Sequence, residues 1–223
     1  MDKYLNRAKE LETQLKTDRQ HIHQNAEAGM CLPNTTTYVK NRLLEIGLEP
    51  EEICTSGVSV LIKGDKPGKT ILLRADMDAL PMGEDNALPF KSTTNAAHTC
   101  GHDLHTAMLL GAEQILKESQ HELCGNVKLM FQPGEELFQG SKTMIDAGIL
   151  ENPAVDAAMS MHVIMDTAVP TVYTNPELAK ELASYVADFA PGFIADTDYK
   201  VTASDDVAFI TGKSAGCSLY DWL

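Results

Sequence analysis

Four short apolar runs, separated by stretches of helical periodicity, constrain the fold of this chain more than any other feature. The runs are VSVLI at 58–62, TILLRADMD at 70–78, NVKLMF at 126–131 and VDAAMSMHV at 155–163. Each is short enough for a strand, which favours buried strands over helices. Because strands that alternate with helices form parallel sheets covered by helices, we expect an α/β fold with a mostly parallel sheet sandwiched by helices.

Five other stretches carry apolar residues at helical spacing. The expected helices lie at about 4–22, 35–46, 104–115, 139–148 and 175–188. Gly47, with Pro50 beyond it, predicts the end of the second helix. The chain has 223 residues, 43% of them hydrophobic, which is enough for one sizeable core. We therefore expect residues 1–223 to form a single domain.

The formal net charge of −14 argues against partners with anionic surfaces, because such a field repels nucleic acid and acidic membranes. No apolar run approaches the ~20 residues that cross a bilayer, and the opening residues lack the apolar core of a signal peptide. We expect a cytoplasmic protein. The five cysteines contain no CxxC pair, which argues against a disulfide framework.

Polar side chains gather where the expected strands end. Asp76 and Asp78 end the second run, Glu135 and Glu136 follow the third, and His162 lies near the end of the fourth. Ligand sites in open α/β sheets form at the carboxyl ends of strands. We therefore expect these side chains to converge on one edge of the sheet.

The segment HTCGHDLHT at 98–106 is the strongest chemical signal. Cys100 and His102 lie two residues apart, with a glycine between them, in a loop that leads into a helix. Cysteine, histidine and carboxylate together suit a zinc-like ion. The alternative is a polar loop with an incidental cysteine, and the segment alone does not fix a ligand set.

The carboxylates and the strand-end histidine each have a structural alternative as well. In PGEE, one of Glu135 and Glu136 can bind a metal while the other moves protons, but an isolated pair is more often solvated. An aspartate of RADMDALP can orient a metal-bound histidine, bind a metal or simply cap the strand. His162 alone is more often structural.

The segment GDKPGKT at 64–70 has the look of a phosphate-binding loop but departs from that motif. The motif needs a glycine where Lys63 stands and a helix afterwards, whereas a strand follows here. A tight turn between two strands, with Gly64, Pro67 and Gly68, explains the residues better.

Taken in order, RADMDALP, HTCGHDLHT, PGEE and MHV resemble the aminoacylase-like and hippurate-hydrolase-like branch of the M20 metallopeptidases. The resemblance extends over about 18–209, including RQHIHQNAEAG, NPELAKE and SDDVAF. It implies a zinc-peptidase-like catalytic domain over 1–223 and a divalent metal site. The ions in such relatives are often paired, and zinc, manganese, cobalt and nickel all suit the ligands.

Carried over residue by residue, the resemblance implies one role for each matching position. The implied metal ligands are Cys100, His102, Glu136 and His162, while Glu135 is the implied general base and Asp78 supports the site. The implied reaction is hydrolysis of a small N-acyl amino acid. Glu135 deprotonates the attacking water and then returns the proton to the leaving amine.

The chain departs from the family pattern in two places. Relatives carry a lid domain after the strand that ends in the MHV histidine, and here an internal deletion near 165–168 is expected instead. A last histidine ligand in an HHP-type segment is also missing. The alternative to an amidohydrolase is therefore a non-catalytic metal-binding remnant or interaction protein. The oligomeric state, the acyl group and the amino acid stay open.

Overall fold

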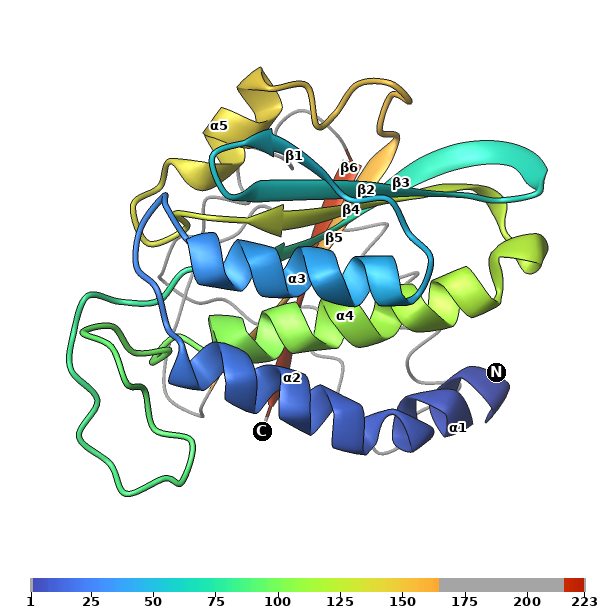
Figure 1. Ribbon diagram of the computed structural model, residues 1–223. Helices are drawn as coiled ribbons and strands as arrows, with labels where there is room; N and C mark the ends of the chain where they lie inside the picture. Colours follow the sequence, from blue (N-terminus) through green and yellow to red (C-terminus); the bar gives the residue numbers. More distant parts are fainter. Residues whose placement is uncertain (1, 165–214, 223) are drawn as a thin grey trace.

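The computed structural model describes residues 2–164 and 215–222 (Figure 1). In chain order the elements are α1 (Asp2–Glu10), α2 (Glu12–Gln24), α3 (Pro33–Glu45), β1 (Glu51–Cys54), β2 (Gly57–Lys63), β3 (Lys66–Asp76), α4 (His102–Glu118), a 3-10 turn (Gln120–Glu122), β4 (Cys124–Gln132), α5 (Gly140–Asp146), β5 (Ala157–Ile164) and β6 (Ala215–Trp222). The expected helix at 175–188 and the expected deletion near 165–168 lie outside the described residues.

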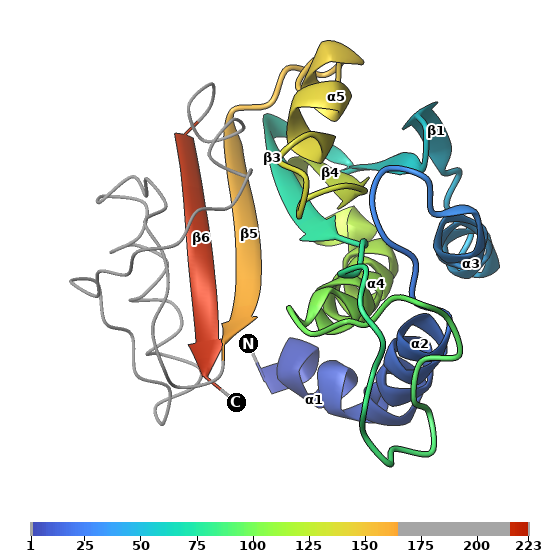
Figure 2. The same ribbon diagram turned by 90° about the vertical axis from the view of Figure 1, so that its left-hand side faces the viewer.

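The described strands form one sheet in the order β1-β2-β4-β3-β5-β6. The pairs β3–β4, β3–β5 and β5–β6 are parallel, whereas β1–β2 and β2–β4 are antiparallel. The predicted α/β class with a mostly parallel sheet is confirmed. The short edge strand β1 and the strand β6 were not predicted, and β6 lies beside β5 at the far end of the sheet (Figure 2).

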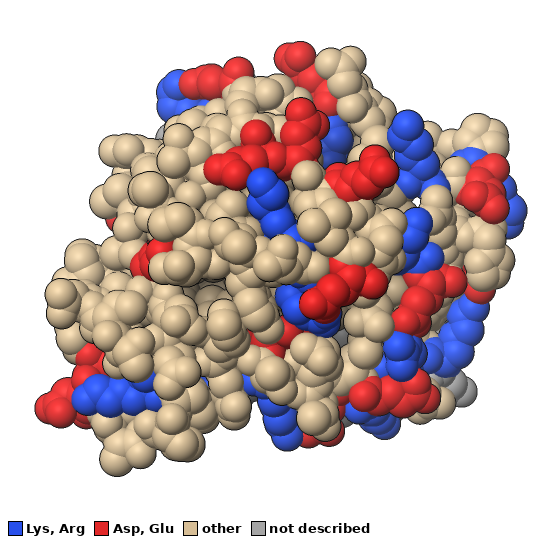
Figure 3. Space-filling view, in the orientation of Figure 1, with Lys and Arg blue, Asp and Glu red and all other residues tan. Residues whose placement is uncertain are grey.

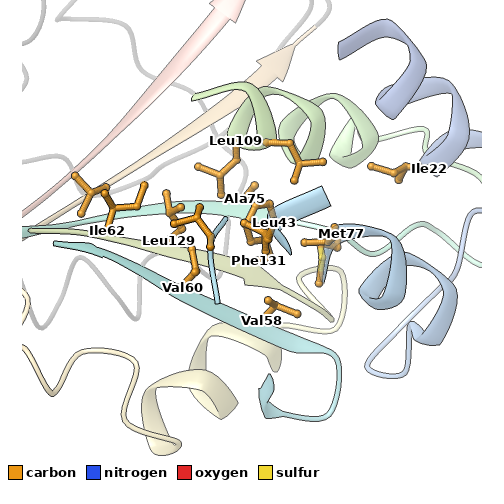
Figure 4. Close-up of a cluster of buried hydrophobic side chains, with 14 of the residues drawn as sticks. Ile22, Leu43, Val58, Val60, Ile62, Ala75, Met77, Leu109, Leu129 and Phe131 are labelled. Carbon is orange, nitrogen blue, oxygen red and sulfur yellow. The ribbon is translucent and has the colours of Figure 1, made fainter. Parts of the chain in front are cut away.

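Helices cover both faces of the sheet. The larger apolar core lies between β2, β3 and β4 on one side and α2, α3 and α4 on the other, with Leu43, Leu129 and Phe131 fully buried in it (Figure 4). A smaller core around Leu72 and Met144 lies on the opposite face beneath α5. Each strand of the sheet's centre therefore buries both of its faces, which explains why the sequence shows continuous apolar runs instead of alternation.

The N-terminal helices differ from the expected ranges in their number and in where α3 begins. The single helix expected at 4–22 is two helices that meet at the buried Leu11. Helix α3 begins at Pro33, two residues before the expected start, and ends before Gly47, where φ is +74°. The Gly47 and Leu48 amides donate to the carbonyls of the last turn, as expected for a glycine stop.

The turn after β2 does not join β2 and β3 into a hairpin, because it crosses over the start of β4. Strand β4 lies between β2 and β3, and the Gly64 amide donates to the Gly125 carbonyl over 2.8 Å. A Cβ built on Gly64 would lie 2.5 Å from that carbonyl oxygen. Glycine is therefore required because two backbones meet there, and no phosphate site is needed to explain it. Pro67 and Gly68 belong to β3.

Candidate metal centre

The structure brings the predicted site residues together at the carboxyl edge of the sheet. Three groups of potential ligand atoms lie within 4.8 Å of one another and share His102. The groups are Cys100 with His102 and His162, Asp76 with His102 and His105, and His102 with Glu135 and Glu136. The elements responsible are the ends of β3, β4 and β5 and the first turn of α4.

His102, the first residue of α4, lies at the centre of this cluster and is fully buried. Its Nδ1 lies 2.8 Å from the Asp78 carbonyl oxygen. Since a carbonyl can only accept, Nδ1 carries a proton, and Nε2 is the nitrogen left for a metal ion. That Nε2 lies 3.7 Å from Glu135 Oε2 and 3.9 Å from Glu136 Oε1, and no residue of the described chain forms a hydrogen bond with it.

Cys100 and His162 form the side of the cluster nearest β5. Cys100 Sγ lies 3.5 Å from His162 Nε2, and His162 Nδ1 donates to the Val163 carbonyl over 2.7 Å. His162 therefore also directs Nε2 toward the site. Gly101, at φ +84°, turns the chain from Cys100 into α4, and a Cβ there would lie 2.4 Å from Val163 Cγ2.

The two glutamates are positioned by Asp78. The Glu135 amide donates to Asp78 Oδ1 over 3.0 Å, and the Glu136 amide donates to Asp78 Oδ2 over 3.2 Å. Asp78 is itself fully buried, just past the end of β3. Its carbonyl and both of its carboxylate oxygens are therefore used to orient His102 and the PGEE turn.

The donor set fits a divalent transition metal. Two ligands of one tetrahedral zinc ion, each about 2.0–2.3 Å from it, lie roughly 3.3–3.8 Å apart. The separations of 3.5 Å between Cys100 and His162 and 3.7 Å between His102 and Glu135 are close to that spacing. His102 Nε2 is a buried polar nitrogen without a hydrogen-bond partner in the described chain, which is costly unless something binds it. Thiol, imidazole and carboxylate together favour zinc and its neighbours.

The electrostatics of the cluster point in the same direction. Burial alone would lower the pKa of His102, but the negative charge of Asp76 and the hydrogen bond to Asp78 raise it well above its usual value. Burial raises the pKa of the Glu136 carboxyl and of the Cys100 thiol. The cluster therefore holds protons that a cation would displace.

Sequence reasoning missed three buried polar residues around the cluster. His105 donates from Nδ1 to Asp76 Oδ1 over 2.6 Å, and Arg74 contacts both Asp76 and Gln132. His105 follows His102 by three residues, and this spacing makes the two side chains neighbours on a helix. That spacing was the signal available in the sequence. Nothing local to Arg74 or Gln132 distinguished them from ordinary strand residues.

A second buried network joins the start of α4 to the 81–95 loop. His23 lies between two carboxylates, with Nδ1 2.8 Å from Asp103 Oδ2 and Nε2 2.8 Å from Glu84 Oε1. Arg19 also donates to Asp103 over 2.6 Å and lies over the Phe90 ring. Since both ring nitrogens face acceptors, His23 is an imidazolium, and the hydrogen bond to Asp103 raises its pKa.

The surface around this edge is poor in charge. The left part of the face seen in Figure 3, over the loops at the carboxyl ends of the strands, is mostly uncharged apart from a group of acidic and basic side chains at its lower edge, whereas the right part carries many charges. Of the exposed large hydrophobic residues, four lie on these loops. They are Met82, Leu88, Leu137 and Phe138, each 41–49% exposed.

Two curated relatives show what this chain is similar to. The N-acetyl-L-cysteine deacetylase of Bacillus subtilis (strain 168) is 43% identical over 174 residues, which cover 76% of this chain and 41% of that protein. The N-acyl-L-amino acid amidohydrolase of Geobacillus stearothermophilus is 36% identical over 161 residues, covering 69% and 43%. The chain thus spans about two fifths of the length of these relatives.

A solved structure supports the fold. It is a dinuclear metal-binding peptidase of the M20 family from Bacillus subtilis, with a TM-score of 0.81 over 96% of this chain and 89% of that chain, at 21% identity. Within the described residues, no helix combines the length and apolar character needed to cross a membrane. Residues 72–206 match the model of peptidase family M20/M25/M40, and the chain therefore belongs to that family.

Proposed function

We propose that this chain is the metal-binding catalytic domain of an amidohydrolase that acts on N-acyl amino acids. The observation that carries the proposal is the buried Nε2 of His102, which faces a thiol, a second imidazole and two glutamates. The relatives named for deacetylation of N-acetyl-L-cysteine and hydrolysis of N-acyl-L-amino acids support the reaction class.

In this proposal Cys100, His102, Glu136 and His162 hold a divalent ion, and Asp78 orients two of them. The ion, when bound, supplies Lewis acidity that polarises the amide carbonyl and lowers the pKa of water. Two ions per site are expected from the family resemblance, and zinc, manganese, cobalt and nickel are the candidates. His102 and His162 suit the role because each donates from Nδ1 and directs Nε2 inward.

Glu135 is the proposed general base and acid. Its side chain is almost buried and reaches within 3.7 Å of His102 Nε2, while its amide is anchored on Asp78. Its carboxylate takes a proton from the attacking water and delivers that proton to the leaving amine nitrogen. A burial of this kind excludes bulk water, which would otherwise exchange the proton before the amine leaves.

The exposed apolar side chains around the site support an apolar acyl group in the substrate. Met82 and Leu88 on one loop and Leu137 and Phe138 on another expose apolar surface at the edge of the sheet that holds the cluster. An acyl chain or ring that packs against such side chains removes apolar surface from water, which contributes about 25 cal/mol of favourable free energy per Å² buried. N-benzoyl and longer N-acyl amino acids are therefore the first substrates to compare with N-acetyl ones.

The test is turnover by the metal-loaded protein. Protein loaded separately with zinc, manganese, cobalt or nickel is assayed for acid release from N-acetyl and N-benzoyl amino acids. Glu135→Gln is expected to lower kcat by roughly 10²–10⁴-fold, the usual contribution of general acid–base catalysis, with metal stoichiometry unchanged. The exposed Glu49→Gln is the matched control and should keep wild-type turnover.

Three results would each contradict part of the proposal. Wild-type protein that binds metal but hydrolyses none of these substrates would favour the non-catalytic metal-binding alternative. Turnover that survives Glu135→Gln would remove Glu135 as the base. Protein that binds no divalent ion would also reject the ligand set.

A further inference from the structure

The carboxyl end of β5, which presents His162 to the site, lies beyond the ladder that joins it to β3. Parallel pairing with β3 covers Ala157–Ser160 opposite Ile71–Arg74 and goes no further in the described chain. This strand end still pairs with β6 along its other edge, so it is the backbone groups facing the β3 side that need another partner. That partner comes from helix α4.

His105 supplies it. The Val163 amide donates to His105 Nε2 over 2.9 Å, and the other ring nitrogen, Nδ1, lies 2.6 Å from Asp76 Oδ1. A backbone amide can only donate, so Nε2 accepts and Nδ1 carries the proton that goes to Asp76. His105 is 2% exposed, so water does not compete for either hydrogen bond.

The contact continues from Val163 to His162. The amide of Val163 is held by His105, and the carbonyl of the same residue accepts the Nδ1 proton of His162 over 2.7 Å. This acceptor fixes which nitrogen of His162 is protonated and leaves Nε2 facing Cys100 Sγ at 3.5 Å. The rings of His105 and His162 also pack edge to face, with centroids 4.5 Å apart.

On its other side, His105 is anchored in the centre of the sheet. Asp76 Oδ2 lies 2.7 Å from Arg74 Nη1, and Arg74 Nε donates to the Gln132 side chain over 2.9 Å. The Thr106 hydroxyl, next to His105, donates to the Asp76 carbonyl over 2.8 Å. These side chains are 0–4% exposed, so the anchor is shielded from water and joins β4, β3 and α4.

We propose that His105 is a positioning residue for the metal site: it replaces the missing β3 ladder at Val163 and thereby directs His162 Nε2 toward Cys100. The inference rests on the proposed function, because it assigns His105 a part in holding the same ion. His105 is not a ligand in this scheme, since its Nε2 is already occupied by the Val163 amide.

Two substitutions separate the two hydrogen bonds. In His105→Asn the side-chain amide can still donate near the Nδ1 position, but it cannot reach Val163. In His105→Gln the longer side chain can place an acceptor near the Nε2 position and accept from Val163. Co²⁺ titrated into the apo proteins, followed by absorption bands that report thiolate and imidazole ligation, measures affinity and ligand set without turnover.

His105→Asn is expected to lower Co²⁺ affinity about 10–100-fold, the usual effect of losing an outer hydrogen-bond partner, and to alter the absorption bands. His105→Gln is expected to recover most of that affinity. Co²⁺ affinity equal to wild type in His105→Asn, or equal losses in both variants, would overturn the proposal. A purely structural role would lower the unfolding free energy of both apo variants and leave the affinity of folded protein unchanged.

A second measurement needs neither metal nor a stable variant. Nitrogen-15 NMR of the histidine rings in wild-type apo protein, at about pH 8 where an unperturbed imidazole is neutral, reports which ring nitrogen carries the proton. His105 and His162 are both expected with the proton on Nδ1. A proton on Nε2 of His105 would overturn the proposal even if Co²⁺ binds, whereas wild-type protein that binds no Co²⁺ would reject the proposed function separately.

Discussion

At the scale of single residues, Asp78 shows how much of the site depends on one side chain. Its carbonyl sets the protonation of His102, and its carboxylate holds the amides of both glutamates. Losing this buried side chain is expected to disturb the site more than the loss of its individual hydrogen bonds would, because Asp78 holds groups from two separate loops in one network. Its neighbour two residues earlier, Asp76, instead faces Arg74 and His105.

Asp78→Asn is expected to weaken metal binding without unfolding the protein. The amide nitrogen of asparagine would face one of the two backbone amides that now donate to a carboxylate oxygen, so one hydrogen bond is lost and the PGEE turn shifts. We expect a loss of about 10–100-fold in Co²⁺ affinity, measured by titration of the apo protein. The exposed Asp85→Asn serves as control, and unchanged affinity in Asp78→Asn would contradict the role given to Asp78.

The buried Glu113, on α4, is expected to make the stability of the protein depend on pH. It is 1% exposed, its Oε2 has no hydrogen-bond partner in the described chain, and burial raises its pKa well above the usual value. The folded protein therefore holds this proton more tightly than the unfolded chain, whose glutamate pKa is about 4.3. The stability it contributes is complete below that pH and is lost as pH rises toward the folded pKa.

Glu113→Gln should remove this dependence, because glutamine is neutral at every pH. We expect the unfolding free energy of the variant minus that of wild type to increase as pH rises above about 4.3, because only wild type loses the stability that protonated Glu113 contributes. Urea unfolding at a series of pH values measures the difference, with the exposed Glu49→Gln as control. A difference that does not change with pH would show that Glu113 titrates normally.

At the scale of elements, helix α3 is capped by a residue that the sequence pattern does not place at its end. The carboxylate of Glu27 accepts the Asn34 amide over 3.2 Å and the Thr35 amide over 2.9 Å, as well as the Thr35 hydroxyl over 3.0 Å. These are amides of the first turn, which have no partner inside a helix. The negative charge also complements the positive end of the helix dipole.

Glu27→Ala is expected to destabilise the protein by about 0.5–2 kcal/mol, the usual cost of a lost cap. Urea unfolding near neutral pH measures it, and the exposed Glu49→Ala provides the matched control. A Glu27→Ala protein as stable as the control would mean that water satisfies the first turn of α3 equally well.

At the scale of the whole molecule, the sheet depends on β4, which is one of its two central strands. Strand β4 lies between β2 and β3, and its Leu129 is fully buried in the larger core. Leu129→Ala is expected to cost about 2–5 kcal/mol, because the removed methyl groups leave a cavity that the sheet cannot close. Leu44→Ala, at a side chain that is 56% exposed, should stay within about 0.5 kcal/mol in the same urea experiment.

Local patterns in the sequence were sufficient for much of this fold. The four apolar runs became β2, β3, β4 and β5, and the carboxyl ends of the latter three meet at one edge, as parallel strands must. Strand β1 was missed because it is a short edge strand with two exposed glutamates. In the helix expected at 104–115, Leu104 and Met108 are only half-buried, because the fully buried face of α4 contacts the sheet and the site instead.

The sequence by itself determined the α/β class and the segments that supply the candidate site, because apolar periodicity and strand-end polar residues are properties of neighbouring residues. The predicted ligand roles and the single catalytic domain over 1–223 stay predictions. Only the tertiary structure decided that Asp78 orients both His102 and the PGEE turn, and that His105 joins Asp76 to Val163. These partners lie 24–58 residues apart, and their hydrogen bonds exist because packing buries them together, which no local pattern encodes.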